Sequence, residues 1–381
     1  MKTLQYLYAV QQSKGANYML SQDLLAELFT PDMTSMEPQD KEGLENNRKL
    51  SCELLDEVIG FSPKSATIFD KNIHVATDRA LQRYNEYNRK DKDHLFKTMI
   101  WETESIADIY LQVLHLLHQI TQFIQQDAAD SDKTALRGET EFKEIYLLEN
   151  PVLNLILENK GLNLEFTNRN TNWDKHLEVA RSFYSHVRKD ELVQAYLKKK
   201  GEVDFATHKE IINHIIRILV FKDEILQSYL ESADSNWYEN KSVVKNMITK
   251  TLKMIEENMS SVTSLVVRLT SDWDEDKAFM KVLFHKTLEN DGYFDEIITH
   301  KLQNWDLERL TITDNLIIKM ALAEMINFQA IPVKVSINEY IEVAKNYSTP
   351  KSKQFVNGIL DKLSADLVEQ GVIKKSGKGL I

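Results

Sequence analysis

The sequence predicts an all-α protein, and two observations carry this prediction. Glycine and proline are scarce, with 11 and 6 residues among 381, which disfavours folds rich in turns and favours long helices. Apolar residues recur at helical spacing along much of the chain, and at 43% of the composition they suffice for a hydrophobic core. The length suggests two or three domains, or one enlarged domain.

Composition also limits the cellular compartments in which we expect the protein. A single cysteine, Cys52, excludes a disulfide framework within the chain and any zinc site built from several cysteines. The first residues, MKTLQYLYAVQQ, are too polar for a signal peptide, and no run approaches 18 apolar residues. We therefore expect a cytoplasmic protein.

The first half of the chain contains several expected helices. Residues Lys2–Gln12 should form a short amphipathic helix, and residues 30–43, TPDMTSMEPQDKEG, should form an exposed loop. Further helices are expected at Glu42–Ile59 and at Thr103–Gln126, where apolar residues recur every three or four positions. Residues 127–140, DAADSDKTALRGET, are expected to form a polar linker.

From Trp173 onward the chain repeats a short pattern. Three segments end alike, DELVQAYL at 190–197, DEILQSYL at 223–230 and DEIITHKL at 295–302, and a weaker one, SVTSLVVRL, ends at Leu269. The closing leucines are 33, 39 and 33 residues apart, which fits stacked helical hairpins. A chance likeness of amphipathic helices is the alternative. We expect residues 141–270 to consist of hairpins related to the Lys277–Leu302 unit.

Motifs for catalysis or metal binding are missing from the sequence. It contains no phosphate-binding GxxxxGK[ST], no GxGxxG and no HExxH. His115 and His118 share a helix face, but their neighbours are leucines, so a half-buried pair is favoured over a metal site. Cys52 lies on an apolar helix face and is interpreted as a small core residue. We predict a protein that is not an enzyme and that holds no cofactor or metal.

Charge is distributed unevenly along the chain. The formal net charge is −11, yet residues 331–381 contain eight lysines and five acidic residues and so carry +3, against −14 for the rest. A basic end on an acidic body can form a surface for a partner. A solvated basic tail explains the same numbers.

This C-terminal part is also highly specified in sequence. Residues 307–328 have the wide apolar face of a buried central helix, which Ile331-Pro332 ends. The pattern SINE predicts a capping box in which Ser336 caps the next helix and Glu339 occupies its third position. Thr349-Pro350 is expected to open the following helix, because proline is favoured at the first helical position.

These residues carry a family resemblance. The stretch VKVSINEYIEVAKNYSTPKSKQFVNGILDKL resembles the C-terminal signature of the NusB family of bacterial transcription antitermination factors, P-x-K-V-x-I-N-E-x-I-E-x-A-K followed by F-V-N-G-x-L-D. Upstream, LFHKTL and FDEIITHKLQNWDLERLTITDNLIIKMALAEM resemble the preceding helices, and LQYLYAVQQ resembles the family's first helix. The resemblance covers about 110 residues.

The sequence also departs from the family pattern. Some 260 residues separate the first helix from the family's later helices, as in long NusB-like proteins of the Bacteroidetes lineage. We therefore expect residues 1–30 to hold the family's first helix and a loop, residues 31–271 to be an inserted helical region, and residues 272–381 to form a NusB-like helical domain with a basic tail. The arginine-rich arm that usually precedes the first helix is not seen, and Lys319 replaces a usual arginine.

The resemblance implies a function and a site. NusB proteins are all-helical and non-enzymatic, and they bind the boxA element of nascent ribosomal RNA transcripts together with the ribosomal protein NusE, so that RNA polymerase passes terminators. The residue types that grip single-stranded RNA are cations and stacking aromatics. They are supplied here by Lys2, Tyr8, Lys345, Lys351, Lys353 and Phe355. Each could instead be a core aromatic or a plain surface charge.

Two other functions remain open on the sequence alone. A NusB-like domain fused to an RNA methyltransferase would need a cofactor-binding α/β domain and a catalytic cysteine, and the sequence suggests neither. A non-enzymatic helical-repeat scaffold, or an RNA-associated interaction protein, would use the inserted helices as its functional part. Because the body is acidic and the basic arm is not seen, we expect weak RNA binding by this chain alone. Binding should be stronger with NusE or with upstream codons restored.

Overall fold

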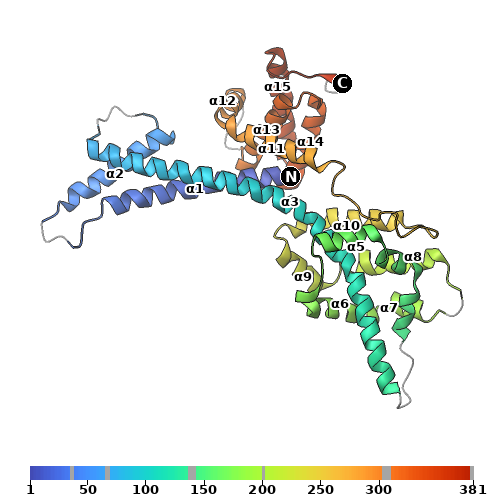
Figure 1. Cartoon of the computed structure of the whole chain (residues 1–381). Helices are drawn as coiled ribbons and strands as arrows, with labels where there is room; N and C mark the ends of the chain where they lie inside the picture. The colour runs from blue at the N-terminus through green and yellow to red at the C-terminus, as the bar shows by residue number, and fades with distance from the viewer. Residues whose placement is uncertain (35–37, 65–68, 136–142, 200–201, 303–309, 378–381) are drawn as a thin grey trace. The chain divides into compact units, whose positions relative to one another are not determined.

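A computed structural model of the chain describes residues 1–34, 38–64, 69–135, 143–199, 202–302 and 310–377 (Figure 1). The described parts are helical and contain no β-strand, which confirms the predicted all-α class. They divide into two compact units. Unit 1 comprises Met1–Trp101 and Asp274–Ile381, and unit 2 comprises Glu102–Trp273. No helix in the described parts combines the length and apolar character needed to cross a bilayer.

Unit 1 is assembled from both ends of the chain. Its helices are α1 (Lys2–Leu28), α2 (Lys41–Ile59), the first half of α3 (Lys71–Ala135), α11 (Trp273–Glu289), α12 (Asp291–Leu302), α13 (Ile312–Asn327), α14 (Val333–Tyr347) and α15 (Ser352–Glu369). The first three helices share a small apolar cluster around Leu25, Leu55 and Ala80, against which the half-buried Cys52 packs. Cys52 therefore lies beside apolar side chains, as its sequence context indicated.

Unit 2 has a larger hydrophobic core of its own, which includes Trp173, Phe183 and Trp237. Its elements after the second half of α3 are η1 (Lys143–Glu149), α4 (Pro151–Leu157), α5 (Lys160–Asn168), η2 (Asp174–His176), α6 (Leu177–Lys189), α7 (Glu191–Leu197), α8 (Phe205–Asn213), η3 (His214–Leu219), α9 (Glu224–Ala233) and α10 (Trp237–Met254). η3 is a π-helical turn that continues α8 without a break, and such turns are often found at functional sites.

Several helices are longer than predicted. α1 extends to Leu28 rather than ending near Gln12, and α3 runs unbroken for 65 residues. Residues 127–135 of the expected polar linker are the last turns of α3, because this stretch holds no glycine or proline that would end a helix. Residues 136–140 of that linker lie outside the described residues.

The three similar segment endings do not play one structural role. Asp190 and Asp223 are the N-caps of α7 and α9, where each carboxylate accepts hydrogen bonds from backbone N–H groups of the first turn. The corresponding Asp295 lies inside α12, where its side chain pairs with Lys319 instead. Residues 261–269, the weaker fourth ending, are irregular. A shared Asp-Glu pair therefore reflects helix capping in two cases and an ion pair in the third.

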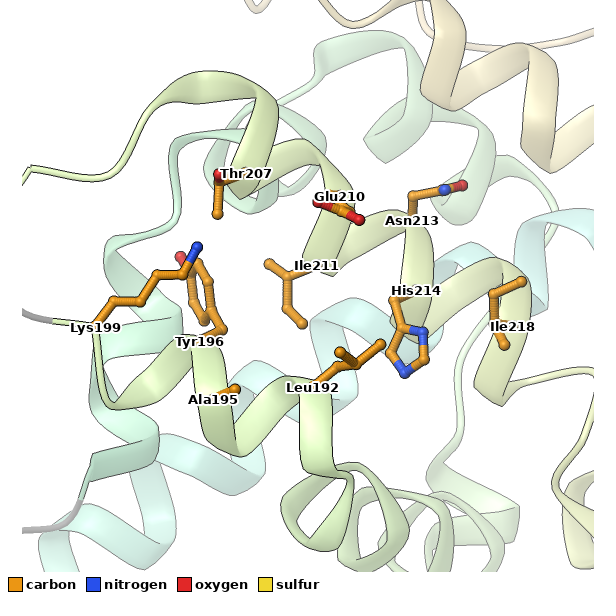
Figure 2. A pocket seen from close by; sticks show the side chains of 10 residues that line it. All are labelled: Leu192, Ala195, Tyr196, Lys199, Thr207, Glu210, Ile211, Asn213, His214 and Ile218. Atoms are coloured by element: carbon orange, nitrogen blue, oxygen red, sulfur yellow. The ribbon is translucent and has the colours of Figure 1, made fainter.

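A surface hollow of about 290 Å³ lies beside the π-helical turn in unit 2 (Figure 2). Figure 2 shows side chains of α7, α8 and η3 around it, among them Tyr196, Ile211 and His214. His214 Nε2 lies 3.0 Å from Asp190 Oδ1, and the Tyr196 hydroxyl lies 2.7 Å from His208 Nδ1. The polar groups on this side of the hollow therefore already have partners within the chain.

Candidate functional site

The predicted site lies around α13, the central helix of the C-terminal part. Eleven of its sixteen residues are buried, which confirms the predicted buried central helix. It packs against α1, α14 and α15. Thr311 caps its N-terminus by accepting a hydrogen bond from the Asp314 N–H at 3.1 Å. α13 thus supports all three helices on which RNA-binding residues were predicted.

The turn between α14 and α15 is fastened to α13 by a polar network. The Ser352 hydroxyl donates to Asp314 Oδ2 at 2.9 Å, and Asp314 is only 1% exposed. Ser348 donates to Ser352 at 2.9 Å, and the Thr349 hydroxyl lies 2.8 Å from the same oxygen. Buried carboxylates require such partners, so this network fixes the turn on the core.

The helix boundaries beside this turn differ from those expected. α14 begins at Val333 with Pro332 as its N-cap, so Ser336 lies inside the helix and its buried hydroxyl has no hydrogen-bond partner among the described residues. The predicted capping box is wrong, because Pro332, four residues before Ser336, already fixes the entry of the chain into the helix. α15 begins at Ser352, two residues after Pro350.

Lys351 and Lys353 lie at the start of α15. Lys351 is the N-cap residue and Lys353 the second residue of the helix, and both are exposed. Neither forms an ion pair within the described parts of the chain. A helix N-terminus favours anions, so two uncompensated cations there strengthen the local attraction for a phosphate.

The other predicted residues are placed less uniformly. Lys345, in the last turn of α14, pairs with Glu342, and Phe355 is half-buried in the first turn of α15. Lys2 and Tyr8 lie on α1, where Tyr8 is 42% exposed. The four C-terminal residues thus lie on either side of one turn, Lys345 before it and the other three after it. Among the described residues, no hydrogen bond or ring contact links Tyr8 to them.

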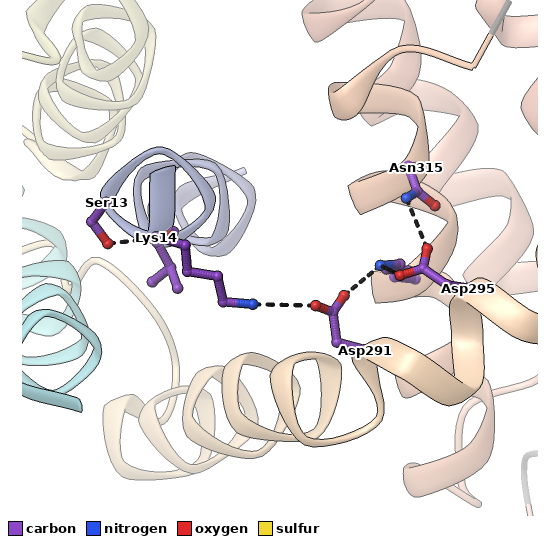
Figure 3. Close-up of polar contacts among 7 residues, drawn as sticks. Ser13, Lys14, Asp291, Asp295 and Asn315 are labelled. Carbon is purple, nitrogen blue, oxygen red and sulfur yellow. Dashed lines mark hydrogen bonds and ion pairs between the residues drawn. The ribbon is translucent and has the colours of Figure 1, made fainter. Parts of the chain in front are cut away.

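A buried cation joins α13 to α12 near α1 (Figure 3). The Lys319 side chain is 5% exposed, donates to Asp295 Oδ2 at 2.7 Å and pairs with Asp291. Lys14 of α1 approaches Asp291 at 3.3 Å, and the Asn315 amide donates to Asp295 at 3.1 Å. Burial alone would raise the pKa of Asp291, but Lys319 and Lys14 outweigh it and hold that pKa below its usual range.

The basic tail is partly tied to unit 1. The Lys375 ammonium donates to the Phe328 carbonyl at 3.0 Å, and burial lowers the pKa of Lys375. The Tyr340 hydroxyl donates to the buried Glu324 at 2.9 Å, and burial with the neighbouring carboxylate raises the pKa of Tyr340 well above its usual value. Part of the tail's charge is therefore held against the core rather than solvated.

His115 and His118 form a stacked pair in unit 2. Their ring centroids are 5.2 Å apart, and Phe166 meets both rings edge-on. No group of three His, Cys, Asp or Glu side chains suited to a metal occurs in the parts of the chain that the structure describes. The pair is held by ring contacts.

The sequence of this C-terminal helical region is similar to that of known proteins. The NusB family model matches residues 240–365, which include α11 to α14 and most of α15. The transcription antitermination protein NusB of Salinibacter ruber is 38% identical over 141 residues, which are 36% of this chain and 88% of that protein. The chain belongs to the NusB family.

Two further NusB proteins extend the comparison. That of Chloroherpeton thalassium is 43% identical over 105 residues, 28% of this chain and 50% of that protein. That of Bacillus licheniformis is 44% identical over 96 residues, 25% of this chain and 74% of that protein. No solved structure matches the chain. The matched NusB segment begins inside α10 of unit 2, earlier than the resemblance near residue 272 indicated.

Two residues that support the NusB-like turn escaped sequence reasoning. Asp314 and Ser352 are 38 residues apart and meet only because α13 and α15 pack together. A signal for the first existed, since TITD (311–314) followed by an apolar run is a capping-box pattern. Nothing local marks Ser352 as the partner.

Proposed function

We propose that this protein is a cytoplasmic transcription antitermination factor that binds boxA-type single-stranded RNA together with the ribosomal protein NusE. It would act as a non-enzymatic adaptor and reach the transcribing RNA polymerase indirectly. Membership of the NusB family supports the general role. The observation that carries the RNA-binding part is the pair of exposed, uncompensated lysines at the start of α15, on a turn fastened to a buried helix.

The proposed contacts are ionic and require little rearrangement. Lys351 and Lys353 would neutralise two phosphates, with the half-buried Phe355 and the exposed Tyr8 as candidates for base stacking. Lys2 and Lys345 would add weaker contacts, because Lys345 already has Glu342 beside it. The fastening of the turn means that the backbone carrying the two lysines is held in place before RNA arrives, which lowers the entropy lost on binding.

Charge reversal of both lysines tests this proposal. Each phosphate contact to single-stranded RNA contributes about −0.7 to the slope of log affinity against log salt. The K351E/K353E double variant, with NusE present, should bind boxA RNA more weakly and flatten that slope by about one to one and a half units. Fluorescence anisotropy at several salt concentrations measures both quantities.

A matched control separates local contacts from net charge. Lys41 and Lys49 are exposed lysines on α2 of the same unit, so K41E/K49E makes the same charge change away from α15. This control should keep the salt slope of the original protein. An unchanged slope in K351E/K353E, with its melting temperature intact, would show that the two lysines are ordinary surface charge.

A second candidate function rests on unit 2, which has its own large core. Residues 31–271 would then be an insertion that acts as a helical scaffold, with the NusB-like part kept as a framework. Capture experiments with purified NusE distinguish the two functions. Retention of NusE supports the antitermination role, whereas loss of NusE binding by the folded protein favours the scaffold.

A further inference from the structure

A second hollow in unit 2 has an unusual charge balance. It has a volume of about 320 Å³ and is lined by side chains of α8, η3 and α10. Three cationic side chains line it, those of Lys209, Arg217 and Lys253, against the single carboxylate of Glu210. This excess of positive charge lies on a chain whose net charge is −11, so general surface composition does not account for it.

Arg217 is the least satisfied group in this hollow. It projects from the π-helical turn η3, and its Nε atom is shielded from solvent with no hydrogen-bond partner among the described residues. Nor does its guanidinium group form an ion pair with any carboxylate in those parts of the chain. A shielded Nε–H left without an acceptor is costly, because it gives up water without a replacement. The terminal N–H groups of this half-buried residue are not shielded in that way and remain available to a ligand in the hollow.

The neighbouring groups are placed to complete a site for an anion. Lys209 Nζ donates to the Ile255 carbonyl at 2.6 Å, which anchors its ammonium beside the end of α10. Lys253 is exposed and has no carboxylate partner in the described parts of the chain. Asn213 lies one helical turn before Arg217, lines the same hollow and can offer its amide N–H.

We propose that this hollow binds a phosphate group. A free phosphate or phosphate monoester carries close to two negative charges at neutral pH and so matches the excess of two cations. A carboxylate or one phosphodiester of an RNA backbone carries a single charge, so RNA would have to place two neighbouring phosphates at the hollow to match it. The terminal N–H groups of the Arg217 guanidinium suit the oxygens of phosphate, and the half-buried position of the residue strengthens the attraction. The proposal does not depend on boxA binding, because no residue of α14 or α15 takes part.

Two probes test the site and distinguish the source of the phosphate. Inorganic phosphate, titrated at constant ionic strength against chloride and acetate, reports on a free phosphate through the melting temperature of the full chain. A labelled single-stranded RNA of random sequence reports on a nucleic-acid backbone through anisotropy, measured in K351E/K353E so that the turn of α15 does not contribute.

The variants are R217Q and K253Q, with K222Q as the matched control. Lys222 is exposed in the same unit, does not line the hollow and undergoes the same loss of charge. General stabilisation by phosphate is common to all variants and therefore cancels. K253Q alters an exposed residue, so it keeps the test valid if R217Q fails to fold.

We expect R217Q and K253Q to weaken binding of at least one probe by about tenfold or more, as loss of a hydrogen bond to a charged group does, while K222Q matches the original protein. A response confined to inorganic phosphate assigns a free or small-molecule phosphate, and a response to RNA assigns its backbone. Affinities of R217Q and K253Q that equal those of K222Q with both probes would overturn the proposal. So would equal stabilisation by phosphate and acetate together with unchanged RNA binding in R217Q and K253Q.

Discussion

Some lysines of unit 1 are paired with carboxylates, whereas others have no carboxylate partner among the described residues. Lys319 is buried between two aspartates, and Lys345 has Glu342 beside it, so neither is free to attract a ligand strongly. Lys351 and Lys353 are exposed and have no carboxylate partner within the described parts of the chain. Residue type alone therefore does not identify a phosphate contact, and our proposal of Lys351 and Lys353 rests on residue type together with the absence of a neighbouring carboxylate among the described residues.

The stacked histidines of unit 2 should make stability depend on pH. Burial lowers the pKa of His115, and burial together with His115 lowers the pKa of His118 to about 4. A histidine with a lowered pKa stabilises the fold fully above its unfolded pKa, near 6.5, and this contribution is lost as pH falls towards 4. For His118 the loss amounts to about 3 kcal/mol.

The variant H118Q cannot take up this proton, so its melting temperature should fall less than that of the original protein between pH 7 and pH 4. The exposed His300 provides a control, since H300Q should keep the original pH dependence. Parallel curves for H118Q and the original protein would rule out His118 as the source.

At the scale of elements, the turn between α14 and α15 depends on one buried contact. Ser352 is the only described partner of the Asp314 side chain, and Asp314 Oδ1 has none in the described residues. The variant S352A should leave a buried carboxylate without any donor and destabilise the protein by about 1–3 kcal/mol.

Chemical denaturation measures this cost. The variant S348A removes a hydroxyl that only donates to Ser352, so it should cost clearly less. If S352A and S348A have the same free energy of unfolding, Asp314 does not hold the turn.

Sequence reasoning predicted elements better than their boundaries. The buried α13 and the turn after α14 follow from apolar spacing and from Pro350, which are local signals. The full length of α3 could have been inferred, since Lys71–Ala135 holds no glycine or proline, but its polar middle hides the helical period. The contacts of Lys319 and Ser352 could not have been predicted from the sequence, because they depend on which helices pack together.

At the scale of the whole molecule, each unit has its own buried residues. Ile317 of α13 and Ile216 of η3 are both fully buried, one in unit 1 and the other in the core of unit 2. The variants I317A and I216A should each cost about 2–5 kcal/mol through the cavity that they leave.

Hydrogen exchange locates the damage in each variant. I317A should reduce protection mainly in the helices of unit 1, and I216A mainly in those of unit 2. The same peptides losing protection in both variants would mean that the two units unfold as one.

The discontinuous make-up of unit 1 has a consequence for synthesis on the ribosome. Its first segment ends at Trp101, and the 172 residues of unit 2 must be translated before the second segment begins. At about 5–20 residues per second this takes roughly 10–35 s. During that time the apolar face of α1 stays without α13, the helix against which it later packs. Unit 2 is contiguous in the chain, so it can fold before unit 1 is complete. A nascent chain stalled before Ile312 would thus present α1 to chaperones and proteases with its binding surface still unmade.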